Sequence, residues 1–493
     1  MSKFYTSVFS RGNYIYSRGY NDGRTFKEKI EFNPTVFVSG KPKGCDEEPW
    51  HTIYGDTVYP LYPGSIRETK DLKKKYEDVH GFDIYGSTGF NYEYIANTWT
   101  KEVPYDINLI NTTFIDIETD VTHGRFPKPE LADEEIVLIT IWSTNRSLFH
   151  TFSFRPIEPI KDAELHIATD EKRMLMDFIT FWSENYPDTI TDWNGVGFDI
   201  PYLVNRITNV LGEDFANKLS PWGWIYAKES KDDYGNIMTI YDLAGINHLD
   251  YMLLYKKFIL KKQESYKLDH IGEVEIGEKK KEYTGSFKNF LDTRWQDFVE
   301  YNIQDVRLII RLNDKLRLLE LAYSISYYAK VNPNDVYSPV KLWDNIIYSY
   351  LLERRKVIPN MVFKNKSEKF DGAFVLDPVI GLQRFVCSFD LTSLYPHIMM
   401  GSNISPETIQ PGNYPHADVD NLLAGTTNTD SAKEMNVSIT ASSNMYTNEF
   451  RGMFPDLMET MFNRRKAAKK EMLKAEQEEE YIKKELEKRG ISV

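Results

Sequence analysis

Asp116 and Glu118, in the segment Thr-Thr-Phe-Ile-Asp-Ile-Glu, have the spacing of a metal-binding pair. Residues two apart in a strand project from the same face, so both carboxylates can bind one cation. Asp199 lies between a phenylalanine and an Ile-Pro pair, and Asp305 lies in a helical segment of apolar periodicity. Acidic side chains in such surroundings are costly unless metal ions or protons compensate their charge. The four residues therefore predict chemistry that depends on divalent cations.

The same residues also have a plainer interpretation. The chain holds 73 acidic residues, so Asp-x-Glu pairs arise by chance, and Glu273-Val-Glu275 is another. Tyr301 and Asp305 are four residues apart on one helical face, which also fits a simple surface pair. Because a motif is a hypothesis that needs its structural context, a metal site and a set of solvated acids both remain open.

A second candidate site, in Ser-Phe-Asp-Leu-Thr-Ser-Leu-Tyr-Pro at 388–396, holds a single carboxylate, Asp390. Metal-dependent nucleotidyl transfer needs at least two carboxylates that converge on a pair of divalent ions. We find no convincing second one downstream. The stretch Thr-Asn-Thr-Asp-Ser at 427–431 is rejected as a source of the second carboxylate. No apolar strand precedes it, and it lies in a predicted loop only a few dozen residues after Asp390. This second site is therefore predicted to be half complete.

Two cations near the C-terminal end, Arg465 and Lys469, are four residues apart and share a helical face. Like charges at this spacing repel, which favours an anionic partner between them. The surrounding stretch 463–489 is rich in Lys and Glu, so a solvated helix is the alternative.

The elements that position these residues follow from the apolar pattern. Residues 1 to about 105 alternate in short segments separated by Gly and Pro, which indicates a β-rich module. Segments 112–118 and 136–142 are predicted strands, and 174–185 is a predicted amphipathic helix. Residues 224–243 are predicted to form a long β-hairpin around Asp-Asp-Tyr-Gly-Asn.

The C-terminal third is predicted to contain a loop and a long helix. Residues 411–435 are polar and weakly patterned, which indicates a loop or insertion. Residues 455–490 have a helical pattern, with Pro455 in the first turn and Gly490 at the end.

The composition of the chain restricts the classes of protein to which it can belong. A chain of 493 residues with 41% hydrophobic and 14% aromatic residues is typical of a folded protein of three or four domains. No run of about 18 apolar residues predicts a membrane span, and the N-terminus lacks a signal core. Cys45 and Cys387 match no zinc or redox spacing, which fits a reducing cytoplasm. The net charge of −13 disfavours a nucleic-acid coat protein but not an enzyme that acts on nucleic acid.

Three of these segments, in their order, resemble the three exonuclease motifs of family B DNA polymerases: Phe-Asp-Ile-Glu, Trp-Asn-x3-Phe-Asp-Ile-Pro-Tyr and Tyr-Asn-Ile-x-Asp-Val. The segment Phe-Asp-Leu-Thr-Ser-Leu-Tyr-Pro resembles their first polymerase motif. The resemblance is closest to the replicative polymerases of T-even-like bacteriophages and covers the N-terminal half of such a protein. It extends to segments 224–243, 338–344, 371–375 and 403–409.

The resemblance implies a multidomain α/β protein. Its domains would be a β-rich N-terminal domain at 1–105, on which 325–365 packs, an RNase H-like 3′–5′ exonuclease at 106–324, a partial polymerase palm at 366–452 and the first part of the fingers at 453–493.

In the implied exonuclease, Asp116, Glu118 and Asp305 hold the ion that activates the attacking water. Asp116 also bridges to a second ion, which Asp199 supports, and Tyr301 orients the water. Ligands that are all oxygen suit Mg²⁺ or Mn²⁺, with two ions in each active site.

In the implied polymerase site, Asp390 is the first of two metal-binding aspartates, with Leu391 beside it at the metal. The family's second aspartate motif and its Lys-x3-Asn-Ser-x-Tyr-Gly helix are missing from the sequence. Tyr395 lies beneath the incoming sugar and excludes a 2′-hydroxyl group. The residues implied to contact the nucleotide are Leu391, Ser393, Leu394, Tyr395, Arg465 and Lys469.

Three functional hypotheses follow, and truncation of a longer chain is a further alternative. The first is the N-terminal subunit of a two-chain DNA polymerase, with the break after the first fingers helix. The second is a self-sufficient 3′–5′ exonuclease with a vestigial polymerase segment, and the third is a non-enzymatic nucleic-acid-binding scaffold. Under the first, the partners are primer-template and single-stranded DNA, dNTPs, a C-terminal chain with the second aspartate and, through that chain, a sliding clamp. No membrane partner is expected, and the location is the cytoplasm, of the host if the chain is phage-encoded.

Overall fold

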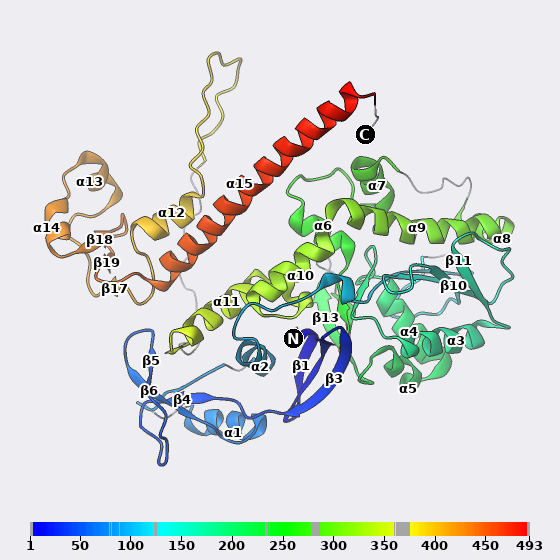
Figure 1. The fold of residues 1–493 in the computed structure, drawn as a ribbon, viewed down its shortest axis with the longest axis horizontal. Helices are drawn as coiled ribbons and strands as arrows, with labels where there is room; N and C mark the ends of the chain where they lie inside the picture. The colour runs from blue at the N-terminus through cyan, green and yellow to red at the C-terminus, as the bar shows by residue number, and fades with distance from the viewer. Residues whose placement is uncertain are drawn as a thin grey trace. The chain divides into compact units, whose positions relative to one another are not determined.

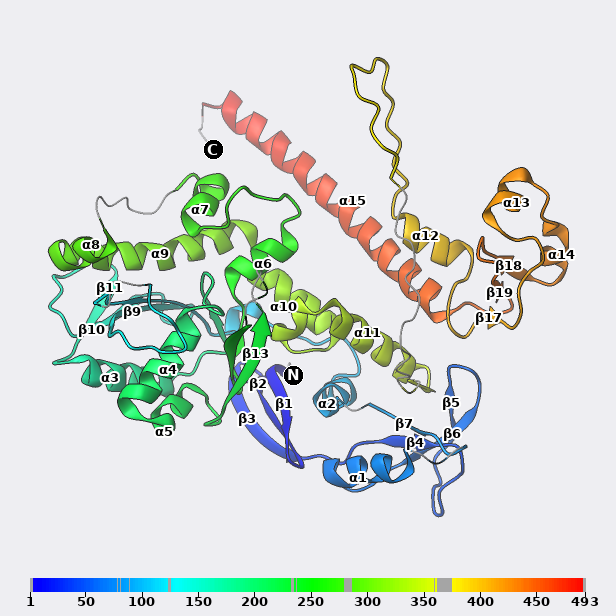
Figure 2. The same ribbon diagram turned by 180° about the vertical axis from the view of Figure 1, so that it is seen from behind.

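A computed structural model of the chain describes residues 3–77, 79, 81–87, 89–122, 126–231, 235, 237–278, 286–358, 360 and 375–490. It divides into two compact units (Figures 1 and 2). The first unit consists of Met1–Thr52 and Thr57–Asn360, and the second of Ile53–Asp56 and Met361–Val493. Most of the predicted hairpin tip at 232–236 and of the segment 371–375 lies outside the described residues.

The N-terminal part of the first unit is rich in strands, as predicted. Strands β1 (Lys3–Arg11), β2 (Tyr14–Asn21) and β3 (Arg24–Glu31) form an antiparallel sheet in that order. Asp22 and Gly23 both have positive φ between β2 and β3, as a tight hairpin turn with the twist of its strands requires. A second sheet has the order β16-β5-β6-β4-β7, and strand β16 comes from far along the chain. Its strands are β4 (Val36–Val38), β5 (Trp50–Thr52), β6 (Thr57–Leu61), β7 (Ile84–Tyr85) and β16 (Lys356–Val357).

A six-stranded mixed sheet with the order β11-β10-β9-β8-β12-β15 forms the centre of the first unit. Its strands are β8 (Thr112–Thr119), β9 (Ile136–Ser143), β10 (Phe149–Ser153), β11 (Ala163–Ile167), β12 (Thr189–Thr191) and β15 (Asn247–His248). Helix α9 (Trp295–Leu316) covers one face, and helices α3 (Glu171–Glu184) and α4 (Asp199–Leu211) cover the other (Figures 1 and 2). Each face therefore has its own apolar core.

Several predicted elements are confirmed in this unit. The strands expected at 112–118 and 136–142 are β8 and β9, and the helix expected at 174–185 is α3. The expected hairpin is formed by β13 (Ile225–Lys231) and β14 (Ile237–Leu243). The remaining helices are α1 (Ile66–Tyr76), α2 (Phe90–Thr98), α5 (Glu213–Ala216), α6 (Tyr251–Phe258), α7 (Leu268–Ile276), α8 (Phe287–Thr293), α10 (Leu318–Ala329), α11 (Pro339–Glu353) and the 3₁₀ turns Ile107–Leu109, Asn217–Leu219 and Pro333–Tyr337.

The second unit contains a small sheet and a long helix. Strands β17 (Ile409–Gln410), β18 (Val437–Ile439) and β19 (Met445–Thr447) form the sheet in the order β17-β19-β18. The predicted C-terminal helix is α15 (Met453–Lys488), and Gly490 follows it with a φ of +71°. Helix α12 (Leu394–Gly401) packs against α15. Among the described residues, no helix is both long and apolar enough to cross a membrane.

The prediction of a loop at 411–435 is wrong in part. This segment contains two six-residue helices, α13 (Val419–Ala424) and α14 (Thr429–Glu434). Each begins after a capping side chain, because Asp418 accepts from the amide of Asn421 and Asn428 accepts from the amides of Asp430 and Ser431. Helices this short are set by their caps and carry too few turns for an apolar period to be visible.

The segment 403–409 fixes the start of α15. The buried Asn403 side chain donates to the carbonyls of Thr447 and Phe450 and accepts from the amide of Gly452. The Glu407 carboxylate accepts from the amide of Met453, 2.5 Å away. The first amides of a helix have no partner inside it, so these side chains cap α15 and set its direction.

Residues 375–390 contain no described helix or strand, although they include many apolar side chains. Ile380 and Phe385 are each 99% exposed, and Phe389 is 93% exposed. A continuous exposed apolar segment of this kind is unusual on a folded surface and typically marks a contact region.

Candidate active site

Three carboxylates from two elements of the first unit converge. Asp116 and Glu118 lie on β8, and Asp305 lies on α9, which packs against this strand. One carboxylate oxygen from each residue lies within 4.8 Å of the others. This separation is short enough for the three residues to share a metal ion.

The apolar pattern of β8 explains why its acids project together. Ile115 and Ile117 are buried in the core beneath α3 and α4, so the alternating Asp116 and Glu118 point to the opposite face, where they are half-buried. The amphipathic helix α9 covers that face and brings the buried Asp305 to them. The carboxylates are thus placed by two hydrophobic surfaces that the chain buries in any case.

Asp199 approaches the same strand from a tight loop. The buried Asp192 carboxylate accepts from the amide of Gly195 at 3.1 Å and pairs with Nε2 of His248 at 2.6 Å. A Cβ at Gly195 would lie 2.0 Å from Cγ of Asp192, so only glycine fits there. The loop delivers Asp199 to the first turn of α4, where its carboxylate accepts from the amide of Ile117 at 3.2 Å. Asp199 therefore adjoins the backbone between the two strand acids.

The electrostatic environment of Asp199 is unfavourable to its charge. Burial, and then the negative charges of Asp192 and Glu118, raise the pKa of Asp199 well above its usual range. The backbone amide of Ile117 opposes this shift. A carboxylate in such a position is stabilised by cations, and a divalent ion nearby returns it to the charged state.

Asn302, which has no predicted role above, also belongs to this site. Its Nδ2 donates to Oδ2 of Asp116 at 2.5 Å, and the side chain is fully buried. Asn302 is three residues before Asp305, so both project from the same face of α9. This spacing within Tyr-Asn-Ile-x-Asp could have identified it. A donor of this kind holds a ligating carboxylate in one orientation.

Tyr301 is held by aromatic packing at the same part of α9. Its ring lies 6.0 Å from that of Phe290, edge to face, and 6.4 Å from that of Phe298, nearly parallel. The side chain is half-buried, so its hydroxyl group has a position fixed by the ring.

The donor set fits hard divalent cations. All the charged groups that converge are carboxylates, and no histidine or cysteine belongs to this group of described residues. Oxygen ligands of this type suit Mg²⁺ or Mn²⁺. The arrangement can therefore hold divalent ions beside an amide donor and a tyrosine, which are the parts needed for metal-assisted hydrolysis of a phosphodiester.

Replacing Asn302 with alanine is expected to slow hydrolysis at this site by about 10–100-fold, because partners that orient metal ligands typically contribute this much. The Mg²⁺ concentration needed for half-maximal rate should rise as well. Single-turnover cleavage measured over a range of Mg²⁺ checks both effects. Asn209→Ala, which removes an exposed amide from α4, is the matched control. An unchanged rate and metal dependence in Asn302→Ala would contradict the orienting role.

The residues of the predicted second site lie in or beside an exposed segment of the second unit. Asp390 is exposed, and Leu391 and Tyr395 are 70% and 72% exposed. Ser393, with a φ of +52°, immediately precedes α12, which begins at Leu394. Among the described residues, Asp390 belongs to no group of three or more potential metal ligands.

Helix α15 brings one predicted cation to the start of α12. Nη1 of Arg465 lies 3.5 Å from Oγ of Ser393. The rings of His397 and Phe462 pack edge to face at 4.8 Å and hold the two helices together. A helix N-terminus beside an arginine is a favourable environment for an anion.

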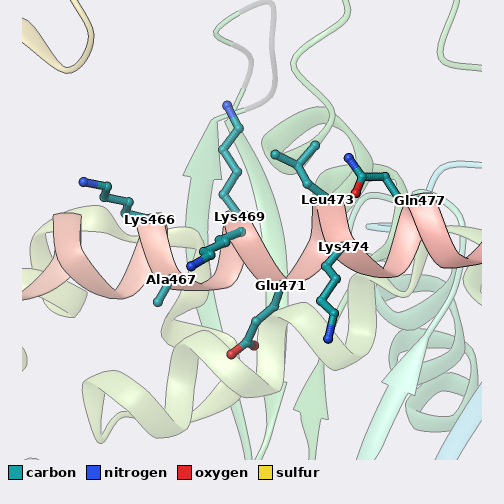
Figure 3. A pocket seen from close by; sticks show the side chains of 8 residues that line it. Lys466, Ala467, Lys469, Glu471, Leu473, Lys474 and Gln477 are labelled. Carbon is teal, nitrogen blue, oxygen red and sulfur yellow. The ribbon is translucent and has the colours of Figure 1, made fainter.

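The other predicted cation, Lys469, lines an open pocket along α15. The residues that line it also include Lys466, Lys470 and Lys474. Figure 3 shows Lys469 and Leu473 projecting from one side of the helix, and Glu471 and Lys474 from the other. Arg465 and Lys469 are four residues apart, so they lie on one face of α15.

Two families of known proteins match separate parts of the chain. Residues 92–271 match the family described as DNA polymerase family B, exonuclease domain. Residues 344–490 match the family described as DNA polymerase family B. The first range contains Asp116, Glu118 and Asp199, and the second contains Asp390.

Individual relatives are DNA polymerases. The chain is 32% identical to a DNA-directed DNA polymerase of Escherichia phage RB69, over 100% of this chain and 56% of the relative. It is 33% identical to a DNA-directed DNA polymerase of Enterobacteria phage T4, over 98% of this chain and 56% of the relative. A DNA polymerase delta catalytic subunit of Candida albicans is 26% identical over 76% of this chain and 36% of its own length. The chain thus spans about half the length of the two phage relatives.

Proposed function

Because the chain belongs to family B of the DNA polymerases, with an exonuclease domain and part of a polymerase domain, we propose that residues 106–324 of its first unit form an RNase H-like 3′–5′ exonuclease that shortens DNA. The observation that carries this proposal is the convergence of Asp116, Glu118 and Asp305 beside Asp199. Two divalent ions bound there would supply a water activated for attack and stabilisation of the leaving oxygen.

The side chains have separate tasks in this proposal. Asp116, Glu118 and Asp305 would hold one divalent ion, and Asp116 and Asp199 would help to hold a second. Asn302 holds Asp116 in one orientation through its amide group. Tyr301 positions the attacking water with its hydroxyl group, and its contacts with Phe290 and Phe298 restrict the ring. Hydrolysis of the last phosphodiester releases a nucleotide and leaves a new 3′ end.

The purified chain should degrade single-stranded DNA from its 3′ end with Mg²⁺ or Mn²⁺. The test compares oligonucleotides labelled at the 5′ end, whose products shorten stepwise if attack begins at the 3′ end. An oligonucleotide with a blocked 3′ terminus serves as the control for direction. If the folded chain leaves the open 3′ end intact with either metal, the exonuclease proposal fails.

The second unit, in this proposal, contributes half of a DNA polymerase active site. Asp390 and the adjoining Leu391 hold metal, and the backbone from Leu391 to Tyr395 meets the triphosphate of a dNTP. Arg465, beside Ser393 at the start of α12, and Lys469 on the same face of α15 contact its phosphates. Two cations near a helix N-terminus offer the charge that a triphosphate requires.

The other half of the polymerase active site is proposed to come from a C-terminal polymerase segment. If the polymerase is split, this segment belongs to a second chain. The exposed apolar residues of 375–391 support it, because a palm sheet that continued there would bury them. The chain matches 56% of each of the two phage relatives, so part of each relative lies outside the match. Primer-template DNA and dNTPs would be the substrates of the assembled enzyme, and a sliding clamp would bind through the C-terminal segment. The proposed domain boundaries are those given above, at 105, 324, 365 and 452.

Tyr395→Ala is expected to admit ribonucleotides to the assembled polymerase. In this proposal the ring fills the space that a 2′-hydroxyl group needs, so its removal should raise the ratio of ribonucleotide to deoxyribonucleotide use by about tenfold or more. Primer extension with matched rNTP and dNTP pairs measures this ratio. Tyr481→Ala, which removes an exposed ring farther along α15, should leave it unchanged. Equal ratios in both variants would remove Tyr395 from the sugar site.

A further inference from the structure

A second group of metal-binding side chains lies at the edge of the central sheet. His150 on β10 is directly opposite Glu164 on the parallel strand β11. His166 follows two residues after Glu164, so it projects from the same face of β11. The structure places one ligand atom from each of the three within 4.8 Å of the others. None of these residues has a part in the two sites described above.

The distances within this group match a tetrahedral ion. Nδ1 of His150 lies 3.2 Å from Nε2 of His166. Oxygens of Glu164 lie 3.5 Å from the first nitrogen and 4.0 Å from the second. A tetrahedral zinc ion with bonds of about 2.0–2.1 Å keeps its ligand atoms roughly 3.3 Å apart. The two nitrogens therefore already have the separation that one ion imposes, and a rotation of the exposed Glu164 side chain brings its oxygen into range.

We propose that His150, Glu164 and His166 bind one Zn²⁺ ion, with water as the fourth ligand. The mixed nitrogen and oxygen donors distinguish this group from the all-oxygen carboxylate site, since imidazole favours zinc and similar transition metals over Mg²⁺. The Glu164 side chain is 55% exposed, which leaves room for water beside it. The ion would join the edge strand β11 to β10.

This zinc site lies on the other face of the sheet from the exonuclease carboxylates. Thr140 on β9 is paired with both Asp116 on β8 and Thr151 on β10, so these three side chains share one face. His150 precedes Thr151 and therefore projects from the opposite face. That face is covered by α3, which packs against β10 and β11. The proposed ion is thus a structural clamp and takes no part in phosphodiester hydrolysis.

Aromatic rings pack against both imidazoles. Phe152 stacks on His166 at 4.3 Å, and Phe181 lies 4.5 Å from the His150 ring.

The proposal is tested by titrating the full chain with Zn²⁺ in excess Mg²⁺, which occupies the carboxylate site. We expect one Zn²⁺ per chain, a zinc X-ray absorption spectrum with two imidazole ligands, and a higher midpoint of thermal unfolding with zinc than without it. Glu164→Gln and His166→Gln should each weaken zinc binding by at least about tenfold, since loss of even an outer partner of a metal ligand costs 10–100-fold. His51→Gln, at an exposed histidine on β5, should bind zinc normally.

Each outcome of these experiments either supports or contradicts the zinc site. Glu164 is exposed, so Glu164→Gln retains its fold and circular dichroism can verify this. If wild-type protein takes up no zinc in excess Mg²⁺, or if Glu164→Gln and His166→Gln bind it as tightly as His51→Gln, the cluster is a hydrogen-bonded pair of histidines only. A spectrum with oxygen ligands alone would place the zinc at the carboxylates and overturn the proposal equally.

Discussion

Asp116→Ala is expected to reduce 3′–5′ exonuclease activity by about a thousandfold or more, because loss of even one electrostatic donor in an active site costs about 10²–10³. Asp116 contributes to the group of three carboxylates and is the residue that Asn302 orients. Its removal takes charge from both proposed ions. The half-buried position on β8 tolerates alanine, so the fold should remain.

The measurement is single-turnover release of nucleotides from a single-stranded oligonucleotide at saturating Mg²⁺. Asp314→Ala is the matched control, since it removes an exposed aspartate from α9, the helix that carries Asp305. Asp305→Ala should resemble Asp116→Ala, and Asp314→Ala should resemble the wild type. Residual activity in Asp116→Ala within tenfold of the wild type would show that the carboxylate group is not the hydrolytic centre.

No template-directed extension is expected from this chain alone, whatever the nucleotide concentration. Asp390 by itself cannot hold two cations against the charge of a triphosphate. The assay uses a chain whose exonuclease is disabled by Asp116→Ala and Asp199→Ala, so that added nucleotides are not removed. Extension of a primer by this chain without any partner would show that the polymerase site is complete.

Mixing with a chain that supplies the second aspartate should restore extension, and the effect should depend on Asp390. Asp390→Ala is expected to abolish extension by the mixture and leave 3′ cleavage by the wild-type exonuclease intact. Asp377→Ala is the matched control, because it removes an exposed aspartate from the same segment of the second unit. If the two variants extend primers equally well, Asp390 is not a metal ligand of the polymerase.

The local part of the exonuclease site could be predicted from the sequence. Strand periodicity placed Asp116 and Glu118 on one face of β8, and this is what the structure has. The meeting of β8 with α9 depends on packing between elements that are about 190 positions apart, which no local pattern encodes. The spacing of Asn302 from Asp305 places both residues on one helical face, but the hydrogen bond from Asn302 to Asp116 joins two elements far apart in the sequence.

In the second unit, the sequence pattern predicts only part of the structure. The helix α15 was predicted from its pattern and its terminal residues, and α13 and α14 were not, because capping side chains define them. The pairing of β16 with β5 joins segments about 300 residues apart. Its register follows from the surrounding core and not from either short segment. The roles assigned to Asp390, Tyr395, Arg465 and Lys469 stay predictions.

The close approach of Gly195 to the Asp192 carboxylate has a consequence for how accurately the proposed polymerase would copy DNA. A methyl group at this position displaces the Asp192 carboxylate, which is buried and bonded on two sides, and so moves the loop that delivers Asp199. Such a change leaves every catalytic residue in the sequence and every element of the second unit untouched. In the polymerase proposed above, this change would leave primer extension intact but weaken the removal of misincorporated nucleotides, so the copied DNA would accumulate mutations. In this proposal, replacing the hydrogen side chain of Gly195 with a methyl group would lower the accuracy of DNA copying without changing a catalytic residue.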